Sequence, residues 1–204
     1  MICMNHIKTV CVYCGSGSGS NPRFAEAAIA LGKTFAENNI RLVYGGGSVG
    51  LMGAVAKSTL DHGGSVTGII PDFLANRERL YSTLTELIVT KTMHERKQIM
   101  FERADAFVAL PGGIGTLEEL VEQMTWAQLG HHQKPIVLLN IDDFWTPLIE
   151  LLQHMKSLGF IHSQQRFRYA VADEVSGVLP LTAATKEPPA LENSVSHPIN
   201  VKQL

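Results

Sequence analysis

Short apolar runs alternate with longer amphipathic segments along most of the chain. The short runs are rich in β-branched residues and stay apolar at successive positions, as is typical of strands with both faces buried. The longer segments have the length and composition of helices. The predicted strands are 10–14, 40–44, 65–70, 86–90, 106–110 and 135–140. The predicted helices are 22–38, 50–60, 93–103, 116–129 and 144–157.

This order of elements predicts an α/β fold in which a parallel sheet carries helices on both faces. Because crossover connections between parallel strands are right-handed, we expect a doubly wound, Rossmann-like sheet. The alternation stops near Pro180, and scattered polar residues and prolines follow. We therefore expect a single Rossmann-like domain over residues 1–180 and a loose C-terminal tail over residues 181–204.

Composition and charge narrow the classes of function. Hydrophobic residues make up 45% of the 204 residues and charged residues 18%, which are ordinary globular values that exclude intrinsic disorder. The formal charge of −2 differs from the basic excess of a nucleic-acid-binding module. No apolar stretch approaches the roughly 20 residues that span a bilayer, and the N-terminus lacks the features of a signal peptide. We expect a cytoplasmic protein that binds neither nucleic acid nor membrane.

The three cysteines lie close together at the start of the chain. An odd number of cysteines in a chain of this length does not form a disulfide framework. Cys11 and Cys14 form a C-x-x-C pair, but no second Cys or His pair follows at the spacing of a zinc site. We expect both to be buried as small apolar residues, without a metal.

Glycine-rich loops follow three of the predicted strands, over residues 15–20, 45–53 and 111–116. Ligands of parallel sheets bind beyond the carboxyl ends of the strands, where these loops lie. Glycine allows a ligand close to the backbone, and the helix after each loop offers free N–H groups to an anion. The three loops predict a phosphorylated ligand, although a tight turn also explains any one of them. The candidate phosphate-loop residues are Gly15, Ser16, Gly45 and Gly46.

The motif Gly45-x-Gly47-x-x-Gly50 matches the dinucleotide-binding fingerprint. It follows the second predicted strand, whereas the fingerprint follows the first strand of a Rossmann fold. A dinucleotide-binding module is therefore a weaker interpretation.

Two basic residues stand beside the buried face of the helix predicted from Met93. Met93, Met100 and Ala104 define that face. Arg96 and Lys97 flank it on either side. A guanidinium at the edge of a buried surface needs an anionic partner. That partner is either a ligand or a glutamate in a structural ion pair, and the residues themselves leave both interpretations open.

The helix after the last glycine loop carries the candidate carboxylate. Thr116 and Glu119 have the spacing of a capping box, with Thr116 at the N-cap and Glu119 three positions later. A carboxylate there stabilises the helix without any chemistry, so position alone does not separate a cap from a catalyst. The residues expected to face the core are Leu117, Leu120, Val121 and Met124.

Trp126 is expected on the opposite face of that helix, away from the sheet, together with Glu119 and Gln123. A large aromatic side chain is costly to leave in water and is typical of protein interfaces. We interpret this face as the contact of a homodimer that also shelters Glu119 from solvent. The alternative is that the chain's own C-terminal segment covers Trp126.

Two spaced motifs stand out: Met93-His94-x-Arg96-Lys97 and Pro111-Gly112-Gly113-x-Gly115-Thr116-x-x-Glu119. They resemble those of the Lonely Guy family of cytokinin-activating phosphoribohydrolases. The resemblance covers residues 10–160 and includes Gly45-Gly46-Gly47, Gly50-Leu51-Met52-Gly53 and Thr125-Trp126-x-Gln128-Leu129-Gly130. Members of this family often carry the label lysine decarboxylase. That label fits poorly, because no lysine here has the setting of a pyridoxal Schiff base.

The resemblance implies hydrolysis of the N-glycosidic bond of a nucleoside 5′-monophosphate, AMP or N6-prenylated AMP, to the free base and ribose 5-phosphate. It implies catalytic roles for Glu119, which stabilises the cationic sugar and activates water, and for Arg96. Arg96 orients the nucleotide and stabilises developing negative charge, or alternatively binds the phosphate. Gly113, Gly115 and Thr116 are expected to hold the phosphate at a helix N-terminus. No metal or other cofactor is implied. The further substrate contacts are Glu78, Lys97, Ile114, Glu118 and Thr125.

Rossmann-like carriers of nucleotides or pterin cofactors use similar glycine loops, so a carrier without catalysis is the alternative function. The joint presence of Arg96 and Glu119 favours the enzyme, because a protein that only binds an anion has no need of that glutamate. The shorter members of the family are dimers, which agrees with the interpretation of Trp126.

Overall fold

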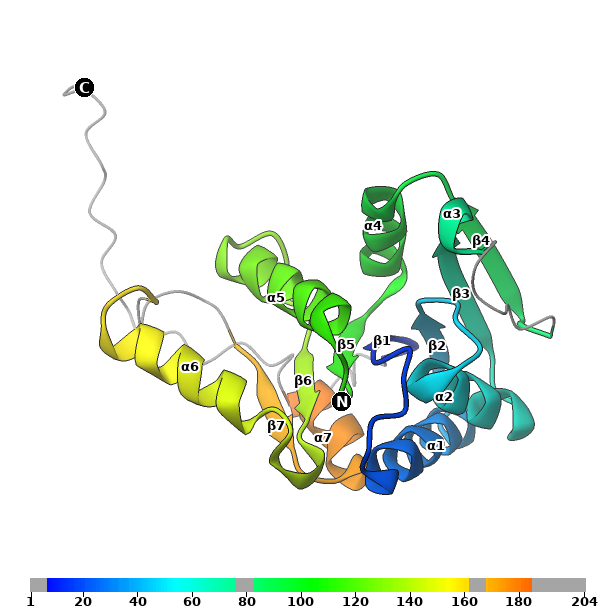
Figure 1. Cartoon of the computed structure of the whole chain (residues 1–204), viewed down its shortest axis with the longest axis horizontal. Helices are drawn as coiled ribbons and strands as arrows, with labels where there is room; N and C mark the ends of the chain where they lie inside the picture. The colour runs from blue at the N-terminus through cyan, green and yellow to red at the C-terminus, as the bar shows by residue number, and fades with distance from the viewer. Residues whose placement is uncertain (1–6, 76–82, 162–167, 185–204) are drawn as a thin grey trace, which may run out of the picture.

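The computed structural model describes residues 7–75, 83–161 and 168–184. Within these residues the chain forms a seven-stranded sheet of parallel neighbours, in the order β4-β3-β2-β1-β5-β6-β7 (Figure 1). The predicted α/β, Rossmann-like fold is confirmed. The strands are β1 (Thr9–Tyr13), β2 (Arg41–Tyr44), β3 (Val66–Pro71), β4 (Glu86–Thr90), β5 (Ala106–Ala109), β6 (Ile136–Leu139) and β7 (Ala170–Ala172).

Helices cover both faces of the sheet and bury an apolar cluster against each (Figure 1). One face carries α1 (Pro22–Glu37), α2 (Gly50–Asp61) and α7 (Val178–Ala184). The other carries α4 (Met93–Arg103), α5 (Ile114–Gln128) and α6 (Thr146–Ser157). The short α3 (Asp72–Ala75) follows β3. Among the described residues, no helix combines the length and apolar character needed to cross a membrane.

The predicted elements agree with the observed ones to within two residues at each end. The sequence pattern does not predict the four-residue α3, the three-residue β7, or α7, which contains Pro180. α7 crosses the expected domain boundary at residue 180, and its Thr182 is buried. Residues 181–184 therefore belong to the folded part, so the expected tail begins too early. Residues 185–204 lie outside the described part of the chain.

β1 and β5 lie side by side at the centre of the sheet. The chain leaves β1 toward α1 on one face and leaves β5 toward α5 on the other, so the loops after these strands diverge and leave a crevice. The N–H of Gly15 donates to the carbonyl oxygen of Pro111 at 3.0 Å and ties the two loops together. This crevice is the place where the fold positions a ligand.

Candidate active site

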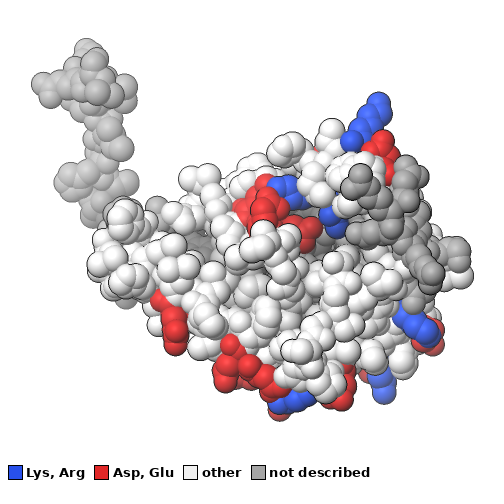
Figure 2. All heavy atoms as spheres, in the orientation of Figure 1, with Lys and Arg blue, Asp and Glu red and all other residues white. Residues whose placement is uncertain are grey.

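A cavity of about 360 Å³ opens at the carboxyl ends of β1, β2 and β5. Its volume is that of a small-molecule site. Figure 2 shows acidic and basic atoms gathered beside a hollow, over the region where Figure 1 places α4 and α5. The cavity is lined by Val12, Cys14, Gly15, Ser16, Gly45, Met52, Leu74, Met93, Arg96, Gly113, Ile114, Gly115, Thr116 and Glu119.

Arg96 reaches from α4 to the ends of the strands and is 8% exposed. Its Nε donates to the carbonyl oxygen of Ile69 at 3.1 Å, and its Nη2 donates to that of Gly45 at 3.2 Å. Its Nη1 lies 3.4 Å from the Sδ of Met93. These contacts fix the guanidinium against the backbone while it lines the cavity.

The carboxyl group of Glu119 faces this guanidinium, with Oε1 3.7 Å from Nη2 of Arg96. Burial raises the pKa of Glu119 to about 7, Arg96 and Lys97 oppose the increase, and the charges of Glu118 and Glu122 add to it. A carboxyl group that titrates near neutral pH can take up and release a proton during turnover. Glu119, which lines the same cavity, is thus the anionic partner expected for Arg96.

α5 begins at Ile114, with Gly113 at the N-cap and no side chain capping it. Thr116 therefore lies inside the helix and Glu119 lies in its second turn, so the predicted capping box is wrong. Glu119 is therefore not explained as a helix cap. The first residues of α5 line the cavity, where their N–H groups and the positive end of the helix dipole suit an anion.

The glycines in the loop before α5 and in its first turn are explained by different requirements. A Cβ at Gly112 would lie 2.2 Å from Oγ1 of Thr116, so packing demands glycine there. Cβ atoms at Gly113 and Gly115 would meet no heavy atom within 4 Å, so the fold itself does not require glycine at either position. Both residues line the cavity. A ligand that approaches the backbone closely accounts for them.

The helices after the other two glycine loops have N-terminal N–H groups that are already hydrogen-bonded. The carbonyl oxygen of Gly15 accepts the N–H of Leu51 at 3.1 Å and that of Met52 at 3.3 Å, in the first turn of α2. At α1, the side chain of Asn21 accepts the N–H of Arg23. These two loops therefore shape the cavity or its surroundings without offering a free helix end.

Three of the four predicted phosphate-loop residues line the cavity: Gly15, Ser16 and Gly45. Gly46 does not. It has a φ of +85°, and a Cβ there would lie 3.0 Å from Cβ of Ile70. Gly46 is thus explained by backbone conformation and packing.

Lys97 lies beside the cavity and not in its lining. Its Nζ donates to Glu118 at 2.5 Å and to Glu122 at 2.9 Å, and its side chain is 9% exposed. Burial by itself lowers the pKa of Lys97, but the hydrogen bonds to the two carboxylates outweigh burial and raise it. Lys97 and Glu118 therefore form an ion-pair network between α4 and α5, next to the Arg96–Glu119 pair.

The structure does not bring Thr125 into the cavity of its own chain. Thr125 is exposed on α5, and its Oγ1 donates to the carbonyl oxygen of Val121 at 2.8 Å. Val121 was expected in the core, yet it is 40% exposed. The remaining predicted contact, Glu78, lies outside the described residues.

Sequence reasoning missed the apolar wall of the cavity. Met52, Leu74 and Met93 line it from α2, α3 and α4, and Cys14 follows β1. Burial raises the pKa of the Cys14 thiol, which stays protonated. Met52 and Met93 belong to motifs that carry the family resemblance, but no local pattern places them in one wall with Leu74, because the three meet only in the folded chain. An apolar wall beside an ion pair suits the flat base of a nucleotide.

Trp126 is partly buried by described residues of its own chain. Residues 185–204, most of the C-terminal segment expected to cover it, lie outside the described residues. The ring of Trp126 packs edge-on against Phe101 of α4, with centroids 5.0 Å apart, and against His131 at 5.4 Å. Gln123, expected on the same outer face, is fully buried. This face of α5 therefore packs toward α4, and the expectation that it turns outward is wrong.

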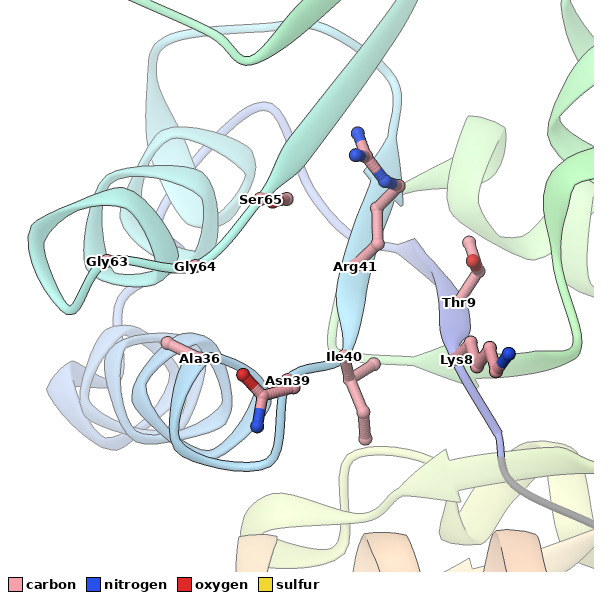
Figure 3. A pocket seen from close by; sticks show the side chains of 9 residues that line it. All are labelled: Lys8, Thr9, Ala36, Asn39, Ile40, Arg41, Gly63, Gly64 and Ser65. Carbon is pink, nitrogen blue, oxygen red and sulfur yellow. The ribbon is translucent and has the colours of Figure 1, made fainter.

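A second cavity, of about 280 Å³, lies at the opposite edge of the sheet (Figure 3). It lies where α1 and α2 end and β1, β2 and β3 begin. Lys8 and Arg41 line it, and no carboxylate does. Nη1 of Arg41 already donates to Oγ1 of Thr67 at 3.1 Å. Cations near helix C-termini stabilise those helices, so this cavity has a structural explanation.

Known proteins resemble the chain over most of its length. The family described as "Possible lysine decarboxylase" matches residues 52–181. A relative from Oryza sativa subsp. japonica, named a probable cytokinin riboside 5′-monophosphate phosphoribohydrolase, is 47% identical over 173 residues, covering 85% of this chain and 75% of its own. The cytokinin riboside 5′-monophosphate phosphoribohydrolase of Rhodococcoides fascians is 44% identical over 182 residues, covering 89% and 90%.

Solved structures share the fold. The molybdenum cofactor binding protein from the phototrophic bacterium Rippkaea orientalis has a TM-score of 0.67 and 23% sequence identity, covering 88% of this chain and 98% of that one. At this identity the likeness concerns the fold alone.

Proposed function

The chain belongs to the Lonely Guy family of phosphoribohydrolases, and on this premise we propose that it hydrolyses the N-glycosidic bond of nucleoside 5′-monophosphates. The products are the free base and ribose 5-phosphate. The names of the relatives specify cytokinin riboside 5′-monophosphates, which corresponds to N6-prenylated AMP, and we include AMP itself. The observation that carries the proposal is the shielded Arg96–Glu119 pair in one cavity with the uncapped N-terminus of α5.

The phosphate binds at the start of α5. The helix has no side-chain cap, and the space around Gly113 and Gly115 is open. A dianionic phosphate there accepts the N–H groups of the first turn and interacts favourably with the helix dipole. Thr116 is 4% exposed and lines the same cavity, where its hydroxyl is available to the phosphate.

Glu119 acts on the sugar. When the bond between C1′ and the base nitrogen breaks, its electron pair leaves with the base, and positive charge develops on the ribose. The ionised carboxylate, whose side chain is 13% exposed, stabilises that cation. A water molecule then forms the new bond to C1′, its proton passes to Glu119, and the released base takes a proton from solvent.

Arg96 supports the ionised form of that carboxylate. Its charge acts against burial, which otherwise favours the protonated acid. Its fixed position between the carbonyl oxygens of Ile69 and Gly45 lets it orient the nucleotide without a cost in side-chain ordering.

The carrier alternative has less support. The molybdenum cofactor binding protein from Rippkaea orientalis shares 23% identity with this chain, whereas the named phosphoribohydrolases share 44% and 47% over most of its length. Decarboxylation of lysine also fits the site poorly. Lys97, beside the cavity, is engaged by Glu118 and Glu122 and is not available for a Schiff base.

We further propose that the working unit is a homodimer formed through α5 and α6. Both helices cover the same face of the sheet and expose apolar side chains. Val121 is 40% and Leu129 76% exposed around α5, and Leu151 is 48% and Met155 36% exposed on α6. Exposed apolar patches mark interaction surfaces, and a two-fold dimer is the commonest assembly that covers one.

Incubation with AMP, an N6-prenylated AMP and adenosine, followed by chromatography of the free bases, tests the activity. We expect base release from the two nucleotides and almost none from adenosine, because phosphate binding contributes to the transition state. Equal rates on AMP and adenosine would contradict the phosphate assignment. Tight calorimetric binding of both nucleotides without base release would identify a carrier instead.

A further inference from the structure

Gln123 of α5 has a buried amide group without a hydrogen-bond partner. The residue is 0% exposed, and neither Nε2 nor Oε1 has a partner among the described residues. Its backbone is held in place, because its carbonyl oxygen lies 3.1 Å from Nε2 of His132. Buried polar groups in folded proteins are almost always paired. An unpaired primary amide at a fixed position therefore needs an explanation.

Glu119 lies four residues before Gln123 on the same helix, and residues at this spacing are neighbours on one face. In the described part of the chain, the carboxyl group of Glu119 accepts no hydrogen bond. The nearest atom of Arg96 is 3.7 Å away, which is a charge contact and not a hydrogen bond. The unpaired side-chain amide of Gln123 thus lies one helical turn from the carboxylate of Glu119, which has no hydrogen-bond donor among the described residues.

Among the described residues, the other groups that face Glu119 offer it no free hydrogen. From α4, Arg96 donates to two carbonyl oxygens and Lys97 to two carboxylates. From α5, Glu118 and Glu122 add negative charge and offer no hydrogen. In the described part of the chain, the remaining titratable groups near Glu119 come from β1 and the residue after it, where burial keeps them protonated: Cys11, Tyr13 and Cys14.

We propose that Gln123 is a positioning residue for Glu119, with its Nε2 donating a hydrogen bond to the ionised carboxylate. The amide reaches the carboxylate through a change in the side-chain torsions of Gln123, because the two residues lie one helical turn apart on α5. The hydrogen bond holds the carboxylate oxygens toward the cavity and favours the charged form over the acid. The expected effect on turnover rests on the proposed function, whereas the hydrogen bond itself does not depend on it.

The variant Gln123→Met tests this role, because methionine keeps the unbranched shape and removes the amide. The titration of Glu119 is followed by NMR of protein with 13C-labelled glutamate carboxyl groups, and the Glu119→Gln spectrum assigns the signal. We expect the pKa of Glu119 to rise by about one unit in Gln123→Met. We expect kcat on AMP to fall about tenfold, the acid limb of its pH profile to move upward, and KM to change little.

Gln153→Met, on the exposed side of α6, is the matched control and should leave the Glu119 titration unchanged. The wild-type protein gives a second measurement that does not depend on the folding of any variant. The side-chain N–H₂ signals of Gln123 should shift with the titration of Glu119. The inference would be overturned if folded Gln123→Met showed an unaltered titration of Glu119, or if the Gln123 signals did not shift with that titration.

If the wild-type protein did not hydrolyse nucleotides, the proposed function would be wrong, and the NMR titration would still decide the role of Gln123.

Discussion

The guanidinium of Arg96 occupies the space that a side chain at position 45 would need. A Cβ on Gly45 would lie 2.1 Å from Nη2 of Arg96, far inside the distance that two such atoms tolerate. This glycine follows β2, whereas Arg96 belongs to α4, so the two become neighbours only in the folded chain. A glycine that the sequence suggests for phosphate binding thus serves to admit the cation of the site.

Gly45→Ala should displace the guanidinium and lower kcat/KM on AMP by about 10²-fold, as small misplacements of catalytic groups do. Gly17→Ala is the matched control, because a Cβ there would meet no heavy atom within 4 Å. Steady-state kinetics of both variants, with circular dichroism to check folding, measure the effect. Full activity in Gly45→Ala would mean that the position of Arg96 is unimportant.

Glu119→Gln should reduce turnover of AMP by about 10²-fold while the protein stays folded. In the wild type, kcat/KM should rise with pH through about 7, because burial raises the pKa of Glu119 to that value and the ionised form is active. The acid limb should be absent from the residual rate of Glu119→Gln. Glu150→Gln, on exposed α6, serves as control, and a variant at position 119 with normal turnover would exclude a catalytic role.

The raised pKa of Glu119 also predicts that the free energy of unfolding depends on pH. Folding raises the pKa of Glu119 from 4.5 to about 7, so the folded state binds this proton more tightly than the unfolded state. The stabilisation is therefore complete below pH 4.5 and is lost as pH rises through 7. Urea unfolding at pH 5 and pH 8 should show wild type losing more free energy of unfolding than Glu119→Gln. Parallel curves for the two proteins would contradict the pKa assignment.

Two neighbouring glycines should respond oppositely to alanine. Gly115→Ala places a methyl group in open space, so the free energy of unfolding should hold or rise slightly, while KM for AMP increases because the phosphate is obstructed. Gly112→Ala forces a contact at 2.2 Å with Thr116 and should destabilise the protein by about 1–3 kcal/mol. Thermal unfolding and KM measurements separate the two effects. An unchanged KM in Gly115→Ala would remove this glycine from the phosphate site.

His132 should act against stability at acidic pH. The N–H of Lys134 donates to Nδ1 of His132, which requires that nitrogen to be unprotonated, and burial lowers the pKa of the ring. A folded-state pKa below the unfolded value of 6.5 means that stability is retained above pH 6.5 and lost as pH falls. The loss between pH 7.5 and 5.5, from urea unfolding, should be smaller in His132→Asn. The exposed variant His94→Asn should keep the wild-type loss, and equal losses in all three proteins would contradict this prediction.

Val121→Glu should separate the proposed dimer, because it places a charge in the apolar surface of α5. Light scattering on a size-exclusion column should give twice the 22.3 kDa of one chain for the wild type and a single-chain mass for the variant. Trp126→Glu is a poor test, because Trp126 packs against Phe101 and its loss would damage the fold. A wild-type protein that elutes with the mass of one chain would refute the dimer.

The sequence by itself determined the order of the six longer strands and of the five longer helices, and the edge of the sheet that carries the site. Apolar runs and helical periodicity are local properties, and the right-handed crossover rule converts their order into a doubly wound sheet. The motifs around Arg96 and Glu119 also identify the two residues that the cavity brings together, 3.7 Å apart.

Only the tertiary structure decided which of the glycine loops keeps a free helix end. The N-terminus of α2 is occupied by the carbonyl of Gly15, a residue more than thirty positions away, and no periodicity in the sequence records that contact. The burial of Lys97 between two carboxylates, the packing of Trp126 on Phe101 and the apolar wall at Leu74 arise in the same way. Each depends on residues from different elements that meet when helices pack on the sheet. Local sequence patterns fix the elements, whereas long-range contacts decide which donors, charges and surfaces remain free.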